Sequence, residues 1–197
     1  GAASAAANDT AFNADGNSYS YFSKGSAVLA VRNVADGVGP AGSIKWTWST
    51  PTLAEIGTVP TPVPLSPASG PREVIFVGAG DGFLYKLDTD GVVLGSVDTR
   101  RYNNGQLLCQ SPPGDGVATP VVQLYNASSP AFKAAVDSVP GHAGDDLVFV
   151  ITRNACGDST RNQIFAYWAS DLTERAVFNR FSPSNPTGMK VDRGPGC

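Results

Sequence analysis

His142 is the only histidine in this 197-residue chain, and it stands close to Asp145 and Asp146. An imidazole beside carboxylates can move protons or hold a metal ion. The run Val-Pro-Gly-His-Ala-Gly around it, however, is typical of an exposed loop between structural elements. We therefore interpret His142 as a loop residue and predict no catalytic role for it.

The remaining polar residues do not form a recognisable catalytic or metal-binding pattern. The Gly-x-Ser-x-Gly elbow that often carries a nucleophilic serine does not occur in the sequence. Asp81, Asp88 and Asp90 lack the Asp-x-Asp-x-Asp-Gly spacing that surrounds calcium with oxygen ligands, and turn capping explains them better. We predict no catalytic, cofactor-binding or metal-binding residues, and we do not expect an enzyme.

Composition favours an all-β fold and restricts the class of partner. The net charge is −3 and the pI is about 5.0, which argues against nucleic acid or an anionic membrane as the main partner. The chain contains 22 Gly and 15 Pro, residues that interrupt helices and form turns. No apolar run approaches the ~20 residues needed to cross a bilayer, so we predict no membrane span.

Short apolar stretches recur along the chain in one order, separated by Gly, Pro, Asp and Asn clusters. Each repeat contains a Thr-Pro-Val strand, an apolar strand, a Gly/Asp turn, an aromatic-containing strand and a final strand. Residues 61–65 match 119–124, 73–77 match 146–150, and 83–88 match 163–168, with an N-terminal echo at 19–22 and 27–31. The final strands are expected at 43–48, 92–98 and 175–181. Four antiparallel strands per repeat indicate β-propeller blades.

The clearest repeat is Val-Gly-Ala-Gly-Asp-Gly-Phe-Leu-Tyr-Lys-Leu-Asp-Thr-Asp-Gly at residues 77–91. It resembles the repeat of PQQ-like (quinoprotein-type) β-propellers, in which a Gly-x-Gly-Asp-Gly-x-Leu-Tyr line links two blade strands and a Trp closes the repeat. Gly80 and Gly82 are expected to allow a tight turn with positive φ, and Asp81 to hydrogen-bond the turn backbone.

The resemblance covers roughly residues 18–181, with one good motif and two degenerate ones. Gly42 to Trp46 supplies the closing Gly-x-x-x-Trp of the first repeat. Gly95 stands where the second repeat should have its Trp, and the third repeat lacks both the closing Gly and the Trp.

We predict an incomplete propeller with about two full blades and a partial one. The expected organisation is a linker or arm at 1–17, blade repeats at 18–181, and a tail or the start of a further blade at 182–197; the repeats divide into a partial blade at 18–50, a blade at 58–100, and a blade with insertions at 117–181. Closed propellers need at least ~4 blades. Other protein chains, or the remainder of a longer propeller, are therefore expected to cover the open faces.

The three cysteines, Cys109, Cys156 and Cys197, lack the Cys-x-x-Cys spacing of zinc sites. If the chain is a propeller, the connections that contain Cys109 and Cys156 emerge on the same face. A Cys109–Cys156 disulfide would then close a loop of about 47 residues and stabilise the fold by roughly 4 kcal/mol. Cys156–Cys197 is the competing pair.

Two sequons, at Asn8 and Asn126, could accept N-glycans in a secretory pathway. The N-terminus is too polar and short to contain a signal-peptide core, so we expect that a signal has been removed or that the chain begins within a longer precursor. Together with the cysteines, these features predict an extracellular, cell-surface or periplasmic location.

The function predicted from these features is a non-enzymatic interaction module that uses its blades as a protein-binding scaffold in an extracellular or cell-surface assembly. The PQQ-like resemblance implies one alternative, a fragment of a quinoprotein-like oxidoreductase whose PQQ and calcium bind outside this segment. A glycan-binding surface is another alternative, with Tyr102 in the run 100–104 as an exposed aromatic platform.

Overall fold

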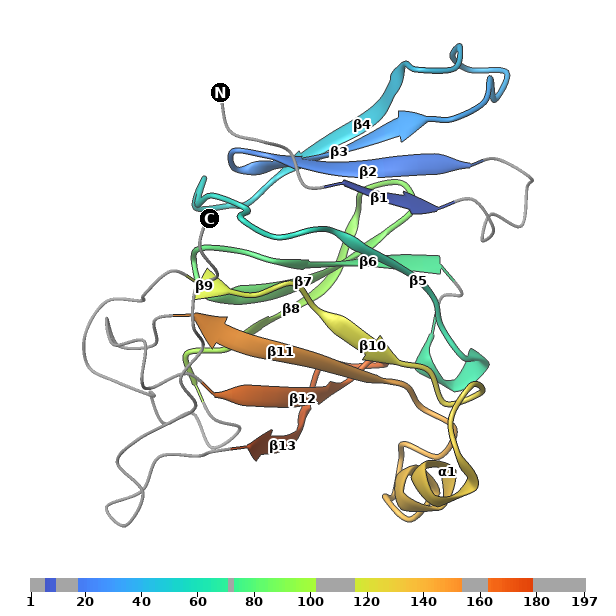
Figure 1. Cartoon of the computed structure of the whole chain (residues 1–197), viewed down its shortest axis with the longest axis vertical. Coiled ribbons are helices and arrows are strands. Elements are labelled where there is room, and N and C mark those ends of the chain that lie inside the picture. Colours follow the sequence, from blue (N-terminus) through green and yellow to red (C-terminus); the bar gives the residue numbers. More distant parts are fainter. Residues whose placement is uncertain (1–5, 10–17, 71–72, 102–115, 154–162, 179–197) are drawn as a thin grey trace, which may run out of the picture.

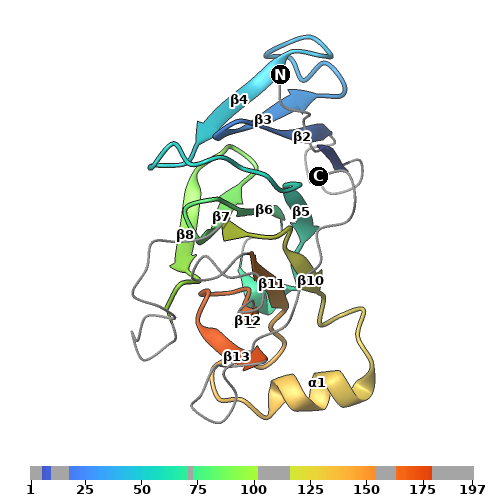
Figure 2. The same cartoon turned by 60° about the vertical axis from the view of Figure 1, so that its left-hand side comes forward.

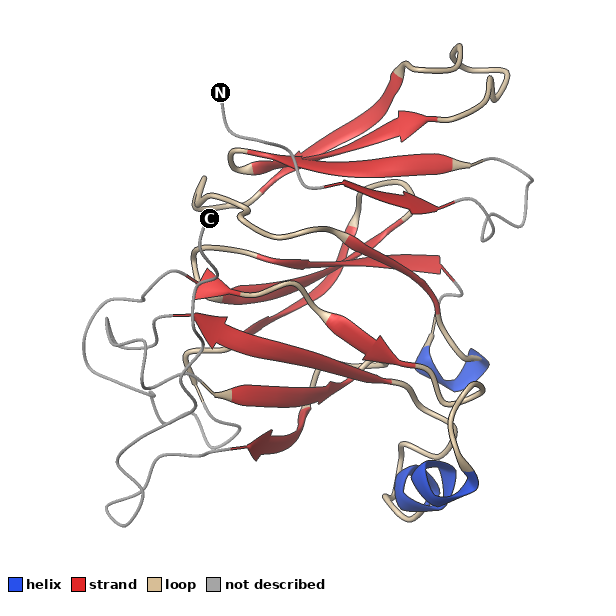
Figure 3. Ribbon diagram, in the orientation of Figure 1, coloured by secondary structure: helices blue, strands red, loops and turns tan. Residues whose placement is uncertain are grey.

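The computed structural model describes residues 6–9, 18–70, 73–101, 116–153 and 163–178. Three antiparallel sheets lie one against the next in chain order, and Figures 1 and 2 show the same stacking from two sides. Figure 3 shows that strands dominate the described residues. The chain is therefore mostly β with a propeller-like arrangement, and the described sheets do not close into a ring.

The first sheet has the order β1-β2-β3-β4. Its strands are β1 (Ala6–Asp9), β2 (Tyr19–Lys24), β3 (Ala27–Arg32) and β4 (Ile44–Ser49). The sequence assigned no strand to residues 1–17, because Ala-Ala-Asn-Asp has neither β-branched residues nor apolar alternation. Strand β1 pairs with β2 along its whole length, from Ala6 opposite Phe22 to Asp9 opposite Tyr19.

The second sheet has the order β5-β6-β7-β8. Its elements are β5 (Thr61–Pro64), the short 3₁₀ helix η1 (Pro67–Ser69), β6 (Glu73–Gly78), β7 (Phe83–Asp88) and β8 (Val93–Asp98). All four strands were predicted from the repeat to within two residues. Local alternation and Gly/Asp turns were sufficient signals here.

The third sheet has the order β10-β11-β12-β13, with β9 also paired to β11. Its elements are β9 (Gly116–Val117), β10 (Val121–Gln123), the helix α1 (Pro130–Asp137), β11 (Leu147–Arg153), β12 (Ile164–Trp168) and β13 (Glu174–Phe178). The sequence predicted the strands β10 to β13 but interpreted the stretch between β10 and β11 as an insertion loop. That insertion contains α1, the one α-helix of the described residues.

Two apolar cores hold the stack together, one at each contact between neighbouring sheets. The core between the first and second sheets includes Tyr21, Val28, Ile75 and Tyr85. The core between the second and third sheets includes residues such as Phe76, Leu84, Val148, Val150, Phe165 and Tyr167. Because successive side chains of a strand point to opposite faces, the second sheet contributes to both cores.

The turn between β6 and β7 confirms most of what the repeat predicted. Gly82 has a φ of 83°, a left-handed conformation that glycine adopts without steric cost. Gly80 does not have a positive φ, contrary to expectation. Asp81 accepts the backbone N–H of Phe83 (3.1 Å) and the hydroxyl of Tyr85 (2.8 Å), as expected for a carboxylate that caps its own turn.

Candidate functional site

Each sheet has a β-bulge at the same place between its third and fourth strands, which makes positions in the three sheets directly comparable. We call the last regular pair before this bulge the bulge pair, and the residue that the bulge leaves unpaired the bulge residue. The bulge pairs are Ala30–Trp46, Lys86–Gly95 and Ala166–Ala176. The bulge residues are Lys45, Leu94 and Arg175.

In the first sheet, the bulge pair reaches across to the second sheet. The indole Nε1 of Trp46 donates a hydrogen bond to the backbone oxygen of Thr89 (2.8 Å). Its ring lies so close to Gly91 that a Cβ there would stand 2.8 Å from the indole. The bulge residue Lys45 also donates to the Thr89 oxygen (3.1 Å) and pairs with Asp90 (2.8 Å). The turn between β7 and β8 is therefore held by the sheet that precedes it.

In the second sheet, the long side chain of the bulge pair comes from the other strand. Lys86 is only 3% exposed. Its ammonium donates to the backbone oxygens of Ala169 (2.6 Å), Ser170 (3.2 Å) and Ser69 (3.3 Å). Burial lowers the pKa of Lys86, while neighbouring carboxylates oppose that shift. As at the first contact, a sheet binds a turn of the sheet that follows it: Lys86 of the second sheet binds the turn between β12 and β13 of the third.

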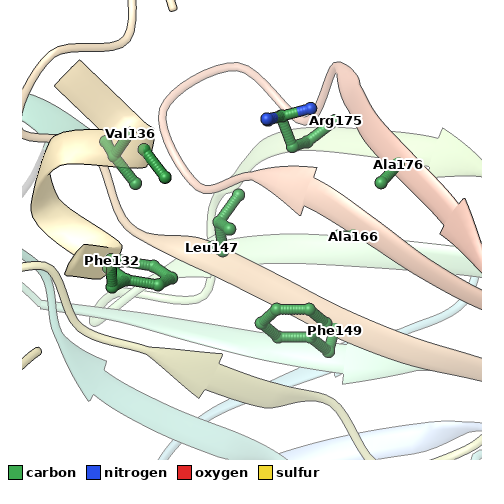
Figure 4. Close-up of a pocket in the computed structure, with 8 residues that line it drawn as sticks. Phe132, Val136, Leu147, Phe149, Ala166, Arg175 and Ala176 are labelled. Atoms are coloured by element: carbon green, nitrogen blue, oxygen red, sulfur yellow. The ribbon is translucent and has the colours of Figure 1, made fainter. Parts of the chain in front are cut away.

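In the third sheet, both members of the bulge pair are alanines, and no long side chain fills the position. A cavity of about 340 Å³ lies above them, on the face turned away from the second sheet (Figure 4). We call this cavity the hollow. It is lined by Phe132, Ala135, Val136, Leu147, Phe149, Ala166, Arg175 and Ala176. The hollow is apolar except for the guanidinium of Arg175.

Helix α1 forms one wall of the hollow. Ser129 caps its N-terminus by accepting the N–H of Phe132 (3.3 Å), and Pro130 occupies the first turn, where a missing N–H costs nothing. Val136 is buried against Leu147 and Trp168, while Phe132 packs at the edge of that cluster. The helix thus covers one end of the outward face of the third sheet and leaves the other end open.

His142 has a structural role in the insertion after α1. Its ring stacks on Trp168 with centroids 4.3 Å apart, and its Nδ1 lies 3.1 Å from Oδ2 of Asp145. The sequence correctly predicted a loop, but the imidazole is half-buried rather than exposed. The signal that was missed is Trp168, which is distant in sequence and lies beneath the ring.

Asp146 joins the insertion to the second sheet. Its carboxylate accepts the backbone N–H of Ser66 (2.6 Å) and of Tyr125 (2.7 Å), and its own N–H donates to Ser69 Oγ (2.7 Å). The side chain is fully buried, so each of these hydrogen bonds is shielded from water. Both ends of the insertion are thereby held next to η1.

The remaining residues singled out in the sequence have structural roles or lie outside the described residues. Asp88 accepts the N–H groups of Asp90 and Val92, which confirms turn capping. Arg100 pairs with Asp98 (2.6 Å).

Asn126 is exposed and Asn8 lies in β1. Tyr102 and the three cysteines, Cys109, Cys156 and Cys197, lie outside the described residues, so the disulfide and the glycosylation sites stay predictions.

Two further features are absent from the residues that the structure describes. No group of three or more His, Cys, Asp or Glu side chains in that part of the chain could hold a metal ion. No helix within the same ranges is both long and apolar enough to cross a membrane.

The residues of the hollow were not identified from the sequence. Alanines have no side-chain chemistry that distinguishes a cavity floor from any other strand position. One signal was present: the third repeat lacks the closing Trp, and β13 has Ala176 at the position of Trp46. A missing large residue in a buried repeat position predicts space.

No family model matches the sequence, and no curated protein matches it. Two solved structures with a similar course of the chain are both of BBS1N in complex with ARL6DN, soaked with mercury or with lead. They share 12% identity with this chain, with TM-scores of 0.44 and 0.45, and the matches cover 82% and 88% of it. The same matches cover only 36% and 40% of those chains. Likeness this distant supports no inference about activity or partners.

Two predictions change after these comparisons. The PQQ-like resemblance is unconfirmed, since no family model matches. The extracellular, cell-surface or periplasmic location is withdrawn, because neither the described residues nor the comparisons support it. That prediction depended on cysteines and on two sequons, and Asn-x-Ser/Thr tripeptides are short enough to occur by chance.

Proposed function

We propose that the chain is a protein-binding scaffold of propeller-like sheets, and that a partner's apolar side chain fills the hollow on the third sheet. The observation that carries this proposal is a difference in burial between side chains at equivalent positions of the three sheets. Tyr21 and Phe76 are fully buried by the sheet that follows each of them. Phe149 occupies the same register position, opposite Ala166, and remains half-buried.

The open area extends beyond the hollow. Val121 pairs with Phe149 in the neighbouring strand and is 63% exposed. Ile164, on the same face, is half-buried, whereas the equivalent Val28 and Leu84 are fully buried. Exposed apolar area of this kind, next to a concave site, is typical of a protein contact.

The free energy gained by filling the hollow is that of burying one apolar side chain of the partner, which would act as an anchor residue. Burying a Leu, Phe or Val side chain contributes about 1.5–3 kcal/mol. Such anchors dominate the energetics of many protein interfaces, while the surrounding contacts exclude water. Arg175 is exposed, with its guanidinium 5.8 Å from the Trp168 ring, and it occupies the position from which Lys45 binds the next turn. It can therefore supply a directed hydrogen bond beside the apolar anchor.

In the test, a photo-crosslinking amino acid replaces Val121 in the full chain. This variant is expressed in cells of the organism from which the chain comes. We expect a crosslink to one defined polypeptide, lost when Ala176→Glu puts a charge into the hollow. Leu53, which is 72% exposed on the connection between the first two sheets, is the control position and should not give this product. Absence of a product at Val121, or the same product at Leu53, would contradict the proposal.

A further inference from the structure

We infer that the partner at the hollow is a second copy of this chain, which docks its first sheet on the outward face of the third sheet. This inference rests on the proposed function and names the partner. It follows from the two contacts inside the chain, because the first sheet retains every part that the second and third sheets use to dock on the sheet before them.

The first part is an apolar face. The second sheet docks through Ile75, Val77, Tyr85 and Leu87, and the third through the equivalent Val148, Val150, Phe165 and Tyr167, all of them 5% exposed or less. The equivalent positions in the first sheet are Ser20, Phe22, Leu29 and Val31. Three of these four are apolar, and those three are only half-buried. The first sheet therefore presents a docking face that nothing in the described residues covers completely.

The second part is a loop before the fourth strand. In both internal contacts, this loop of the following sheet binds the bulge region of the preceding sheet, through Thr89 in one case and Ala169 in the other. In the first sheet, the corresponding loop is residues 33–43, between β3 and β4. It presents Val34 and Val38 to solvent, and Val38 is 87% exposed, more than any other large apolar residue described.

The loop is held in shape by Asp36. Its carboxylate accepts Arg32 Nε (2.6 Å) and the backbone N–H groups of Gly39 (2.9 Å) and Val38 (3.0 Å). Burial of the carboxyl acts against ionisation, but these donors prevail and lower the pKa of Asp36 to about 2. Val38 is thus displayed on an ordered loop, which reduces the entropy lost on binding.

The two surfaces are complementary in size and chemistry. The hollow of about 340 Å³ has room for a valine side chain together with the loop backbone around it. Arg175 would donate to backbone oxygens of the loop, as Lys45 donates to Thr89 in the internal contact. The small Ala166–Ala176 pair leaves the space that Trp46 or Lys86 fills elsewhere.

This contact is heterologous, since the first sheet of one copy meets the third sheet of another. After one such contact each copy would therefore retain one free face: the third-sheet face of one copy and the first-sheet face of the other. If two copies engaged both pairs of faces, their sheets, three from each copy, would form one ring. That total lies within the range of roughly four to eight blades found in closed propellers.

The experiment is sedimentation velocity of the purified full chain over a wide range of concentration. We expect the mass to rise with concentration to that of two copies. Val38→Asp, which alters only the loop, and Ala176→Glu, which alters only the hollow, should each weaken association at least roughly tenfold. Thermal melting of each variant checks that it is folded, and Leu53→Asp is the matched control for an exposed apolar residue.

Mixing the two variants gives the decisive result. Val38→Asp retains an intact hollow and Ala176→Glu retains an intact loop, so the mixture should associate where each variant alone does not. A chain that stays monomeric at every concentration, or variants that associate like the unaltered chain, would overturn the inference. A crosslink from Val121 to a different polypeptide would then leave the proposed function standing.

Discussion

Two surfaces of the molecule use the same register positions but fill them with different side chains. One is the contact between the second and third sheets, and the other is the outward face of the third sheet. In the contact, the ammonium of Lys86 crosses from the bulge pair to the backbone oxygens of the next turn. On the outward face, Ala166 replaces it and a hollow remains. The two surfaces thus differ at one residue of the bulge pair, which in one case is a long side chain that holds the neighbouring sheet and in the other leaves space.

The largest effect is expected from removing the long side chain at the closed contact. Lys86→Ala should lower the free energy of unfolding by about 3 kcal/mol, because three backbone oxygens lose their donor, two of them in buried hydrogen bonds. Urea unfolding followed by circular dichroism measures this. Lys45→Ala is the matched control, since that lysine serves the same purpose with its side chain partly in solvent, and it should cost less than about 1 kcal/mol. Equal costs for the two variants would show that burial does not distinguish the contacts.

A second prediction compares one substitution at one register position in two sheets. Ala30→Leu should lower the free energy of unfolding by about 1–3 kcal/mol, because Ala30 is fully buried under the second sheet and no space exists for the added atoms. Ala166 is only 1% exposed, but it lines the hollow, so the added atoms of Ala166→Leu have space there and stability should change by less than about 0.5 kcal/mol. Thermal melts of both variants provide the measurement. A large loss from Ala166→Leu would mean that the cavity is too small to accept a side chain.

A third prediction concerns the indole at the first contact. Trp46→Phe keeps most of the apolar area but removes the hydrogen bond to Thr89, and it should cost about 1 kcal/mol in unfolding free energy. Trp48→Phe is the control, because Trp48 makes a ring contact with Tyr85 and its indole has no hydrogen bond within the described residues. We expect the control to be closer to the unaltered chain in urea unfolding. The reverse order would show that the hydrogen bond has little weight.

The smallest effect is a pH dependence confined to the β3–β4 loop. The pKa of Asp36 in the folded chain is about 2, below its ordinary value of 3.8. A depressed carboxyl pKa contributes stability that is present above pH 4 and lost as the pH falls toward 2. The protection factors of Val38 and Gly39 in amide hydrogen exchange, which are corrected for the intrinsic pH dependence of exchange, should therefore fall across this range. Asp36→Asn should abolish this change in protection, and protection that is insensitive to acid in the unaltered chain would contradict the assignment.

Strands that follow local rules were predictable from the sequence. Val74 to Val77 and Phe83 to Asp88 have the β-branched and aromatic residues that strands favour, bounded by Gly and Asp. Strand β1 was not, because Ala6 to Asp9 pairs through its backbone with a strand ten residues away. Helix α1 had a local signal in Ser129 and Pro130, but its flanking Pro and Gly residues favoured a loop.

The candidate site depended on information that no single segment contains. Ala166 and Ala176 become a bulge pair only after β12 and β13 are aligned, and the hollow needs α1 as its wall. The absent Trp of the third repeat could have indicated the space. It could not indicate which face of the sheet was open, because that depends on how the sheets stack.

Asp146 has a further consequence for how this protein can diversify. One carboxylate binds both the start of the insertion, at the N–H of Tyr125, and the neighbouring sheet, at the N–H of Ser66. We therefore expect the stretch between these fixed ends, α1 included, to tolerate changes of length and sequence, as the hypervariable loops of an antibody do on their framework. Such changes would alter the wall of the hollow and, under the proposed function, the choice of partner, while the strands beneath remain in register.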